Sequence, residues 1–175
     1  MRMTTPSRPC PPRQGPGWRA AGVALALWLA GTASALTLRG QTTDGDTVDI
    51  ASLRGQVVLL FFWSTACPVC LDKLPELRRN LAGWTGQPFV VVAVNQDPDR
   101  QAHDAYMRLR RQLVPASPQW KDLWRGNAAH RDDVGPLPGH VPVTVLLDRA
   151  GQVRLRVEGR IAPGLWDDVA ELVLH

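Results

Sequence analysis

Seven consecutive apolar residues, 57–63, constrain the fold of this chain more than any other feature. The run reads VVLLFFW and does not alternate with polar residues, which is typical of a strand covered on both faces in the centre of an α/β sheet. Two cysteines, Cys67 and Cys70, follow directly, and a helical stripe of apolar residues starts at the second one. The pattern therefore predicts a buried strand that is followed, at a dithiol, by an amphipathic helix.

A second strand and helix are predicted after the dithiol. Residues 89–94 are again apolar without alternation. The inner face of the next helix is predicted to comprise Ala102, Ala105, Leu109 and Leu113, and its arginines, Arg108, Arg110 and Arg111, are expected to be solvated. Trp120 and Trp124 favour a short packed helix, and residues 126–140 are typical of a loop.

The C-terminal part predicts a hairpin and a closing helix. Residues 143–147 are apolar, whereas residues 152–158 alternate apolar and polar side chains, as a half-exposed antiparallel strand does. A final helix is expected from about Pro163, since proline is favourable in a first turn. The sequence thus predicts an α/β fold in which a central mixed β-sheet is flanked by helices on both faces.

The positive charge of the chain is confined to its first 35 residues. Of the 20 basic residues, four lie in this segment, which has no acidic residue; residues 36–175 therefore hold 16 basic and 16 acidic side chains. The net charge of +4 and the pI near 9.5 come from this leader. Nucleic acid is therefore not expected as a partner of the domain.

The leader has the three parts of a secretory signal. A basic stretch ends at Arg19, an apolar run covers residues 20–30, and small residues stand at 33–35. The apolar run is short for a bilayer, which needs about 20 helical residues. We expect a signal peptide over residues 1–35 and one domain over residues 36–175, exported to the periplasm or elsewhere outside the cytoplasm. The alternative is an uncleaved anchor, which is the only membrane association expected.

Cleavage would remove Cys10 and leave Cys67 and Cys70 in an oxidising compartment, where cysteines serve disulfide chemistry. Unpaired N–H groups and the helix dipole at a helix N-terminus stabilise a thiolate, which is the nucleophilic form of cysteine. We expect Cys67 to cap the helix with its sulfur exposed and Cys70, about one turn later, to face inward. Cys67 would then attack a disulfide and Cys70 would resolve the mixed disulfide.

Three other roles remain open for the two cysteines. A purely structural disulfide would constrain the unfolded chain little, because its ring is so short. A zinc site would need two more ligands, and the four histidines, His103, His130, His140 and His175, have no standard zinc spacing. Buried, unreactive thiols are the third possibility. No metal and no cofactor are expected.

Residues 60–70, LFFWSTACPVC, together with Pro75, resemble the thioredoxin superfamily, and most closely its exported TlpA-like (ResA-like) thiol–disulfide oxidoreductases. The segment VPVT at 141–144 resembles the cis-proline strand of that family. The resemblance covers residues 38–174, with residues 114–138 poorly matched. It implies a thioredoxin-like fold, an attacking Cys67 and a resolving Cys70.

The resemblance also implies a substrate groove. Pro142 would be a cis-proline facing the dithiol, and Val141 would offer its backbone to an extended substrate chain. Trp63 has two candidate roles, one beside this groove and one in the core. The implied partners are protein disulfides, including those of cytochrome or copper-protein assembly, and a membrane thiol that supplies electrons.

Two departures from the family pattern concern the environment of the dithiol. Ala66 stands where the family usually has tryptophan, and Lys73 where it often has glutamate. We expect Lys73 to be solvated; the alternative is that its charge lowers a thiol pKa. The direction of electron flow stays open, because reductases and oxidants share the CxxC motif.

Three other functions compete with disulfide exchange. Residues 64–67 resemble the loop of thiol peroxidases, which would consume peroxide through the same cysteine. A copper-binding chaperone would use His140 together with the two cysteines. A peptide-binding module would leave the cysteines inert.

Overall fold

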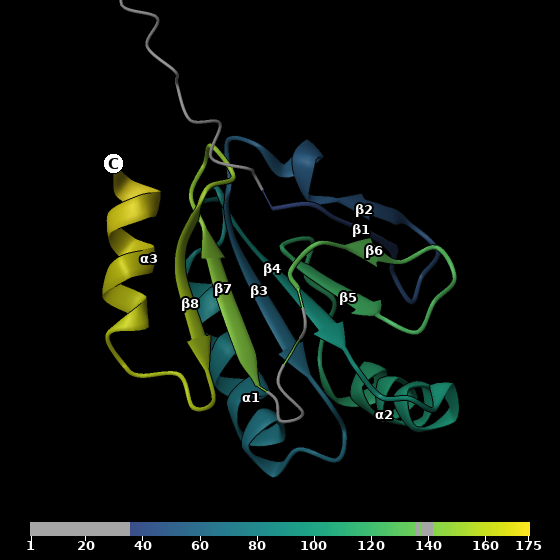
Figure 1. Ribbon diagram of the computed structural model, residues 1–175. Coiled ribbons are helices and arrows are strands. Elements are labelled where there is room, and N and C mark those ends of the chain that lie inside the picture. The colour runs from purple at the N-terminus through teal and green to yellow at the C-terminus, as the bar shows by residue number, and fades with distance from the viewer. Residues whose placement is uncertain (1–35, 136, 138–141) are drawn as a thin grey trace, which may run out of the picture. The chain divides into compact units, whose positions relative to one another are not determined.

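The computed structural model describes residues 36–135, 137 and 142–175 of the 175-residue chain. The elements, shown in Figure 1, are β1 (Leu38–Gln41), β2 (Thr47–Asp49), η1 (Ile50–Leu53), β3 (Val57–Trp63), α1 (Pro68–Gly83), β4 (Phe89–Asn95), α2 (Arg100–Leu113), β5 (Trp120–Trp124), β6 (Arg131–Asp132), β7 (Val143–Leu147), β8 (Val153–Glu158) and α3 (Leu165–Leu174). Within these residues, none of the helices has the length and apolarity needed to cross a bilayer.

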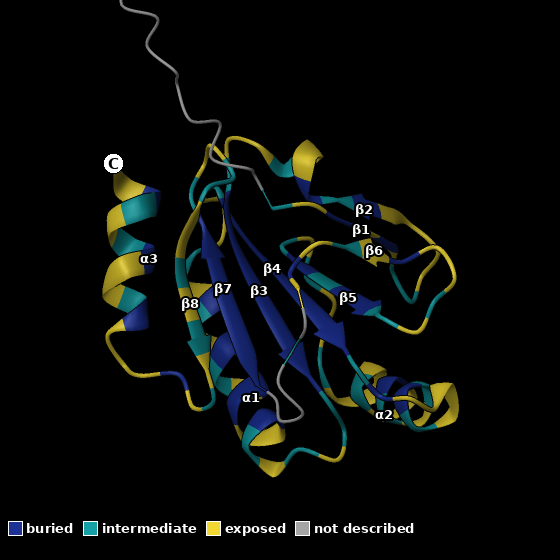
Figure 2. Cartoon of the chain, viewed as in Figure 1, coloured by how far each residue is buried: buried dark blue, intermediate teal, exposed yellow. Residues whose placement is uncertain are grey.

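A five-stranded mixed sheet with the order β5-β4-β3-β7-β8 forms the centre of the fold. Strands β3, β4 and β5 run parallel, β7 is antiparallel to β3, and β8 is antiparallel to β7. Every residue of β3, β4 and β7 is buried, as the dark blue strands of Figure 2 show. The predicted α/β class, the mixed sheet and the buried central strand are therefore confirmed.

One face of the sheet packs against α-helices. The odd-numbered residues of β3, from Val57 to Trp63, share a core cluster with α1 and α3. Helix α1 contributes the stripe expected from the sequence, namely Cys70, Leu74, Leu77 and Leu81. Because Cys70 belongs to this stripe, packing of the helix fixes the position of the second cysteine.

The opposite face of the sheet packs mainly against other strands. The even-numbered residues of β3, from Val58 to Phe62, share a second cluster with Leu38 of β1, Val48 of β2 and Ile50 of η1. Strands β2, β1 and β6 form a separate three-stranded antiparallel sheet. Among the described residues in this second cluster, the only helical element is the short 3-10 helix η1.

The segment from Trp120 to Trp124 is strand β5, so the helix predicted there is wrong. It pairs with β4 along the edge of the sheet, with Val91 opposite Trp120 and Asn95 opposite Trp124. A spacing of four places two side chains on one face of a helix, but it does the same in a strand, where the period is two. Pairing with β4 decided between these structures.

The inner face of α2 also differs from the prediction. His103 and Met107 are the buried residues of this helix, whereas Leu109 and Leu113 are 57% and 71% exposed. Arg110, which was expected to be solvated, forms an ion pair with Asp122 of β5, and both side chains are nearly buried. The helix therefore packs through a mixed polar face, which a stripe of leucines and alanines could not indicate.

Candidate active site

Cys67 and Cys70 form a disulfide at the junction of β3 and α1, with 5.2 Å between their Cα atoms. Cys67 is partly exposed, whereas Cys70, a residue of α1 itself, is fully buried in the core. The inward orientation predicted for Cys70 is therefore confirmed. Of the two cysteines, Cys67 is therefore the one that is accessible to solvent.

Cys67 is the N-cap residue of α1, as predicted. Its extended backbone, with φ −104° and ψ 102°, turns into the helix, and its Sγ accepts a hydrogen bond from the backbone N–H of Cys70 at 3.1 Å. Pro68 occupies the first helical turn, where the lack of an N–H costs no hydrogen bond. A sulfur at this position lies close to the unpaired N–H groups and the positive end of the helix dipole.

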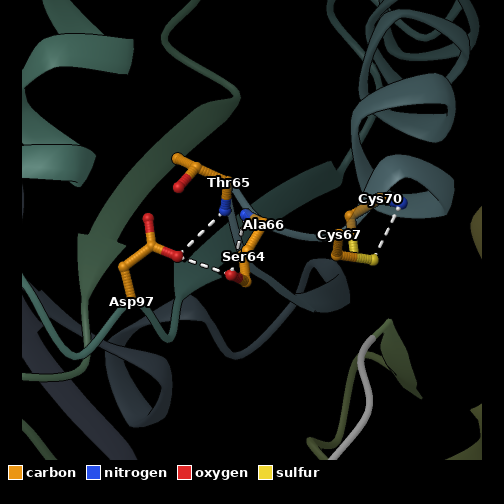
Figure 3. Close-up of a disulfide and its surroundings, with 6 residues drawn as sticks. All are labelled: Ser64, Thr65, Ala66, Cys67, Cys70 and Asp97. Carbon is orange, nitrogen blue, oxygen red and sulfur yellow. Dashed lines mark hydrogen bonds between the residues drawn. A yellow bond between two sulfur atoms is a disulfide. The ribbon is translucent and has the colours of Figure 1, made fainter.

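The loop between β3 and Cys67 is bound to Asp97, which lies two residues beyond the end of β4 (Figure 3). The hydroxyl of Ser64 donates to Asp97 Oδ1 at 2.5 Å, and the backbone N–H of Thr65 donates to the same oxygen at 2.9 Å. Asp97 is only 4% exposed. The sequence reasoning did not single it out, although a carboxylate just after the neighbouring parallel strand was an available signal.

Burial opposes the charged form of Asp97, but hydrogen bonds from Ser64, Asn95 and Thr65 outweigh it and lower the pKa of this carboxyl. Asp97 is therefore an ionised group at neutral pH. It lies behind the loop that carries Cys67, and the close-up shows its carboxylate directed at Ser64 and Thr65 (Figure 3).

Lys73 is buried, so its predicted solvation is wrong. Its side chain is 8% exposed, and Nζ lies 2.7 Å from Oε2 of Glu76 on the same helix. The hydrogen bond from Lys73 lowers the pKa of Glu76, against the opposing effect of burial. The position where the resemblance led us to look for a glutamate therefore holds one half of a Lys–Glu pair.

Trp63 lies in the core and not at the surface. It is 1% exposed, and its ring centroid is 4.8 Å from that of Tyr106 in α2. Of the two roles that the sequence left open for Trp63, packing in the core is the one found. Its side chain supports the strand that precedes the dithiol.

Pro142 is buried immediately before β7, and its carbonyl accepts a hydrogen bond from the N–H of Gly159 at 2.7 Å. Because Val143 pairs with Phe62, this proline lies at the same end of the sheet as the disulfide. Val141 and His140 fall outside the described residues. Within the described part of the chain, no three metal-binding side chains converge on one point.

This arrangement is suited to reversible disulfide chemistry. A partly exposed sulfur at a helix N-terminus can become a nucleophilic thiolate when the disulfide is reduced, and a buried second sulfur one turn away can close the ring again. Substrate disulfides would approach from the side of Cys67.

Comparisons with known proteins agree with this chemistry. A model of the AhpC/TSA family matches residues 31–156, which include both cysteines. The thiol-disulfide oxidoreductase ResA of Bacillus subtilis is 26% identical over 137 residues, or 76% of this chain and 70% of ResA. The thiol:disulfide interchange protein DsbE of Escherichia coli is 29% identical over 115 residues, or 66% of this chain and 56% of DsbE.

A solved structure extends the likeness to the fold. A crystal structure described as a thiol:disulfide interchange protein DsbE from Chlorobium tepidum superposes with a TM-score of 0.58 and 26% identity. The match covers 80% of this chain and 92% of that protein.

Proposed function

The chain belongs to the AhpC/TSA family and is a thioredoxin-fold thiol–disulfide oxidoreductase similar to ResA and DsbE; from this premise we propose that it reduces or exchanges disulfides in exported proteins through Cys67 and Cys70. One observation carries the assignment of roles. The partly exposed Cys67 caps α1 and is joined to a fully buried Cys70.

In the proposed reaction, the reduced protein starts with Cys67 as a thiolate and Cys70 as a thiol. The Cys67 thiolate attacks one sulfur of the substrate disulfide, an S–S bond forms between the two proteins, and the substrate's other sulfur leaves as a thiolate. Cys70, once deprotonated, attacks Cys67 and releases the second substrate sulfur. Two electrons pass to the substrate, the released thiolates take up protons, and the protein is left with the Cys67–Cys70 disulfide.

The proposed substrate groove lies beside the N-terminal end of β7. The pairing of Val143 with Phe62 supports it, because this register brings Pro142 to the end of β3 from which Cys67 follows. We assign to Pro142 the shaping of this groove, and to Val141 a backbone contact with an extended substrate chain. Because Trp63 is buried, it would support this groove only from the core side.

The proposed setting is the periplasm or another exported location. The leader over residues 1–35, with its basic stretch, apolar run and small residues, supports this setting. A reductase in an oxidising compartment needs a source of electrons, and we propose a membrane thiol as the donor. Proteins of cytochrome assembly are candidate clients. Mass spectrometry of the protein recovered from a periplasmic fraction tests both export and loss of residues 1–35.

Insulin-disulfide reduction with dithiothreitol as electron source tests the proposed activity. We expect the wild type to accelerate precipitation of the insulin chains, the Cys67→Ser variant to lose this activity, and the Cys70→Ser variant to accumulate a mixed disulfide with its substrate. A matched control, Cys10→Ser, removes the third cysteine of the chain and should retain full activity. Full activity of Cys67→Ser would reject the assignment.

Peroxide consumption by the reduced protein separates the proposed function from the peroxidase alternative. We expect the wild type to consume peroxide no faster than a mixture of free thiols does. Rapid consumption that depends on Cys67, without insulin reduction, would establish the peroxidase in place of the oxidoreductase.

A further inference from the structure

Asp97 reaches the loop that carries Cys67 from a neighbouring strand. Strands β3 and β4 are parallel, and Trp63 at the end of β3 pairs with Asn95 at the end of β4. The segments that follow the two strands therefore leave the sheet at the same edge. Residues 64–66 lead to Cys67, and Asp97 lies just beyond β4.

The carboxylate of Asp97 binds two residues of this loop directly and a third through the Ser64 hydroxyl. Its Oδ1 accepts hydrogen bonds from the Ser64 hydroxyl and the Thr65 N–H. A hydroxyl has one hydrogen to donate, so the Ser64 oxygen remains free to accept, and it does so from the N–H of Ala66 at 3.1 Å. The N–H of Cys67 then donates to the Ser64 carbonyl at 3.2 Å.

Asp97 is itself held in place by hydrogen bonds with Asn95 of β4 and Trp124 of β5. Asn95 donates through Nδ2 to Asp97 Oδ2 at 3.0 Å and accepts through Oδ1 from the Asp97 N–H at 2.9 Å. The indole N–H of Trp124 in β5 donates to the Asp97 carbonyl at 2.8 Å. Asn95 and Asp97 are both buried, so these bonds are shielded from water. A rigid anchor on β4 and β5 therefore holds the loop.

The position of the Cys67 sulfur depends on this loop. The Sγ atom accepts from the Cys70 N–H only while Cys67 stands at the N-cap of α1, and the loop of residues 64–66 sets where the chain enters the helix. Once the disulfide is reduced, the covalent link to Cys70 no longer holds the sulfur there. Non-covalent contacts, those of the loop and those of the helix cap, then keep it at the helix N-terminus.

We propose that Asp97 is a positioning residue for the nucleophile, which acts through Ser64 and Thr65 to keep the Cys67 sulfur at the N-cap of α1 in the reduced protein. This inference rests on the proposed function and adds a residue to it. Asp97 does not touch the substrate. Its effect on reactivity comes from where it holds the thiolate.

The direction in which the reactivity of Cys67 changes, once the Asp97 carboxylate is removed, distinguishes a positioning role from a purely electrostatic one. A negative charge near a thiolate disfavours it, so if charge alone mattered, removal of the carboxylate would make Cys67 more reactive at neutral pH. If positioning matters, its removal loosens the loop, weakens the capping bond and makes Cys67 less reactive. A merely structural role would lower thermal stability and leave the reactivity unchanged.

The test measures the rate of alkylation of Cys67 by iodoacetamide against pH in the reduced full chain. A Cys10→Ser background removes the third thiol, and mass spectrometry assigns the labelled cysteine. The variants are Asp97→Asn and Ser64→Ala. The second removes the two hydrogen bonds of the Ser64 hydroxyl, to Asp97 and from Ala66, without changing a charge. Asp99→Asn is the control, because Asp99 caps α2 through the Gln101 N–H and, within the described part of the chain, forms no hydrogen bond with residues 64–66.

We expect Asp97→Asn and Ser64→Ala to slow alkylation at pH 7 by roughly fivefold, the equivalent of one capping hydrogen bond, and to move the pH profile to higher pH. Asp99→Asn should follow the wild-type profile even if its melting temperature falls. An unchanged profile, or one moved to lower pH, in both test variants would overturn the proposal. If Asp97→Asn does not fold, Ser64→Ala decides alone.

Alkylation needs no disulfide client, so the two proposals can fail separately. A wild type that does not reduce insulin rejects the proposed function, whatever the alkylation profiles show. A wild type that reduces insulin, with alkylation unaffected by both substitutions, rejects only the role of Asp97.

Discussion

Lys73 and Glu76 form an ion pair on α1, with Nζ 2.7 Å from Oε2, one helical turn after the buried Cys70. Lys73 is nearly buried, whereas Glu76 keeps about a third of its side chain in solvent. Glu76 therefore provides a charge partner for the ammonium group of Lys73, which is packed against the core.

Removal of the Glu76 charge should destabilise the fold, because the buried ammonium group of Lys73 is left without its charge partner. We expect Glu76→Gln to reduce the free energy of unfolding at pH 7 by about 1 kcal/mol, a value discounted for the exposure of Glu76. The double variant Lys73→Met/Glu76→Gln, which has no unpaired charge, should recover most of the loss. Urea unfolding of the oxidised protein measures both; equal stability of Glu76→Gln and wild type would contradict the expectation.

Asp122 should be more important for stability than other carboxylates that contact α2. It pairs with Arg110 and accepts from the Trp120 indole N–H at 2.8 Å, while burial and the charge of Arg110 lower the pKa of the nearby Arg78. Asp122→Asn removes the negative charge that offsets the repulsion between the partly buried guanidinium groups of Arg78 and Arg110. We expect a loss of about 3 kcal/mol in chemical unfolding.

The control for this substitution is Asp44→Asn, which removes the partner of the exposed Arg111. No measurable loss is expected there, because pairs in solvent contribute little. Similar losses in the two variants would show that burial of the Arg110–Asp122 pair has no special effect.

Asp132 should contribute to the stability of the fold above about pH 4. Burial raises its pKa, but hydrogen bonds from His130 and Arg125 outweigh this effect, and the pKa lies below its ordinary value of 3.8. A lowered folded-state pKa means that the stabilisation is fully present above the unfolded pKa of about 3.9 and is lost as pH falls through the folded pKa.

Urea unfolding between pH 7 and pH 2.5 checks this expectation. Asp132→Asn should be less stable than the wild type at pH 7, and the difference should shrink toward pH 2.5. The neighbouring exposed Asp133, which accepts from the Thr37 N–H at 2.7 Å, is the matched control. A constant difference across the pH range would refute the role assigned to ionised Asp132.

Alanine substitutions should distinguish the buried face of α2 from its exposed leucines. Met107 is 2% exposed, and Met107→Ala should cost about 2–3 kcal/mol because it opens a cavity. Leu109→Ala and Leu113→Ala, at exposed sites, should change stability by less than about 0.5 kcal/mol. Thermal and urea unfolding measure all three. A larger loss of stability for Leu113→Ala than for Met107→Ala would mean that Leu113 packs on the inner face of α2, as the sequence pattern predicted.

Local patterns along the chain were sufficient to identify the central strand, the helix after it and the dithiol between them. Residues 57–63 have a run of apolar side chains that is typical of a strand covered on both faces, and the stripe from Cys70 onward has the helical period. The capping role of Cys67 follows from the same local order, because a helix N-terminus leaves its N–H groups unpaired whatever the rest of the fold does.

Tertiary structure alone decided features that depend on contacts between distant segments. The spacing of Trp120 and Trp124 fits either a helix or a strand, and it is the pairing with β4 that made this segment a strand. Lys73, Arg110 and Asp97 each look like solvated residues in the sequence. Each is buried or nearly so because a partner, Glu76, Asp122 or Ser64, meets its charge with a hydrogen bond. A periodic pattern reports which side chains avoid water, but it does not report which buried charge will find a partner elsewhere in the fold.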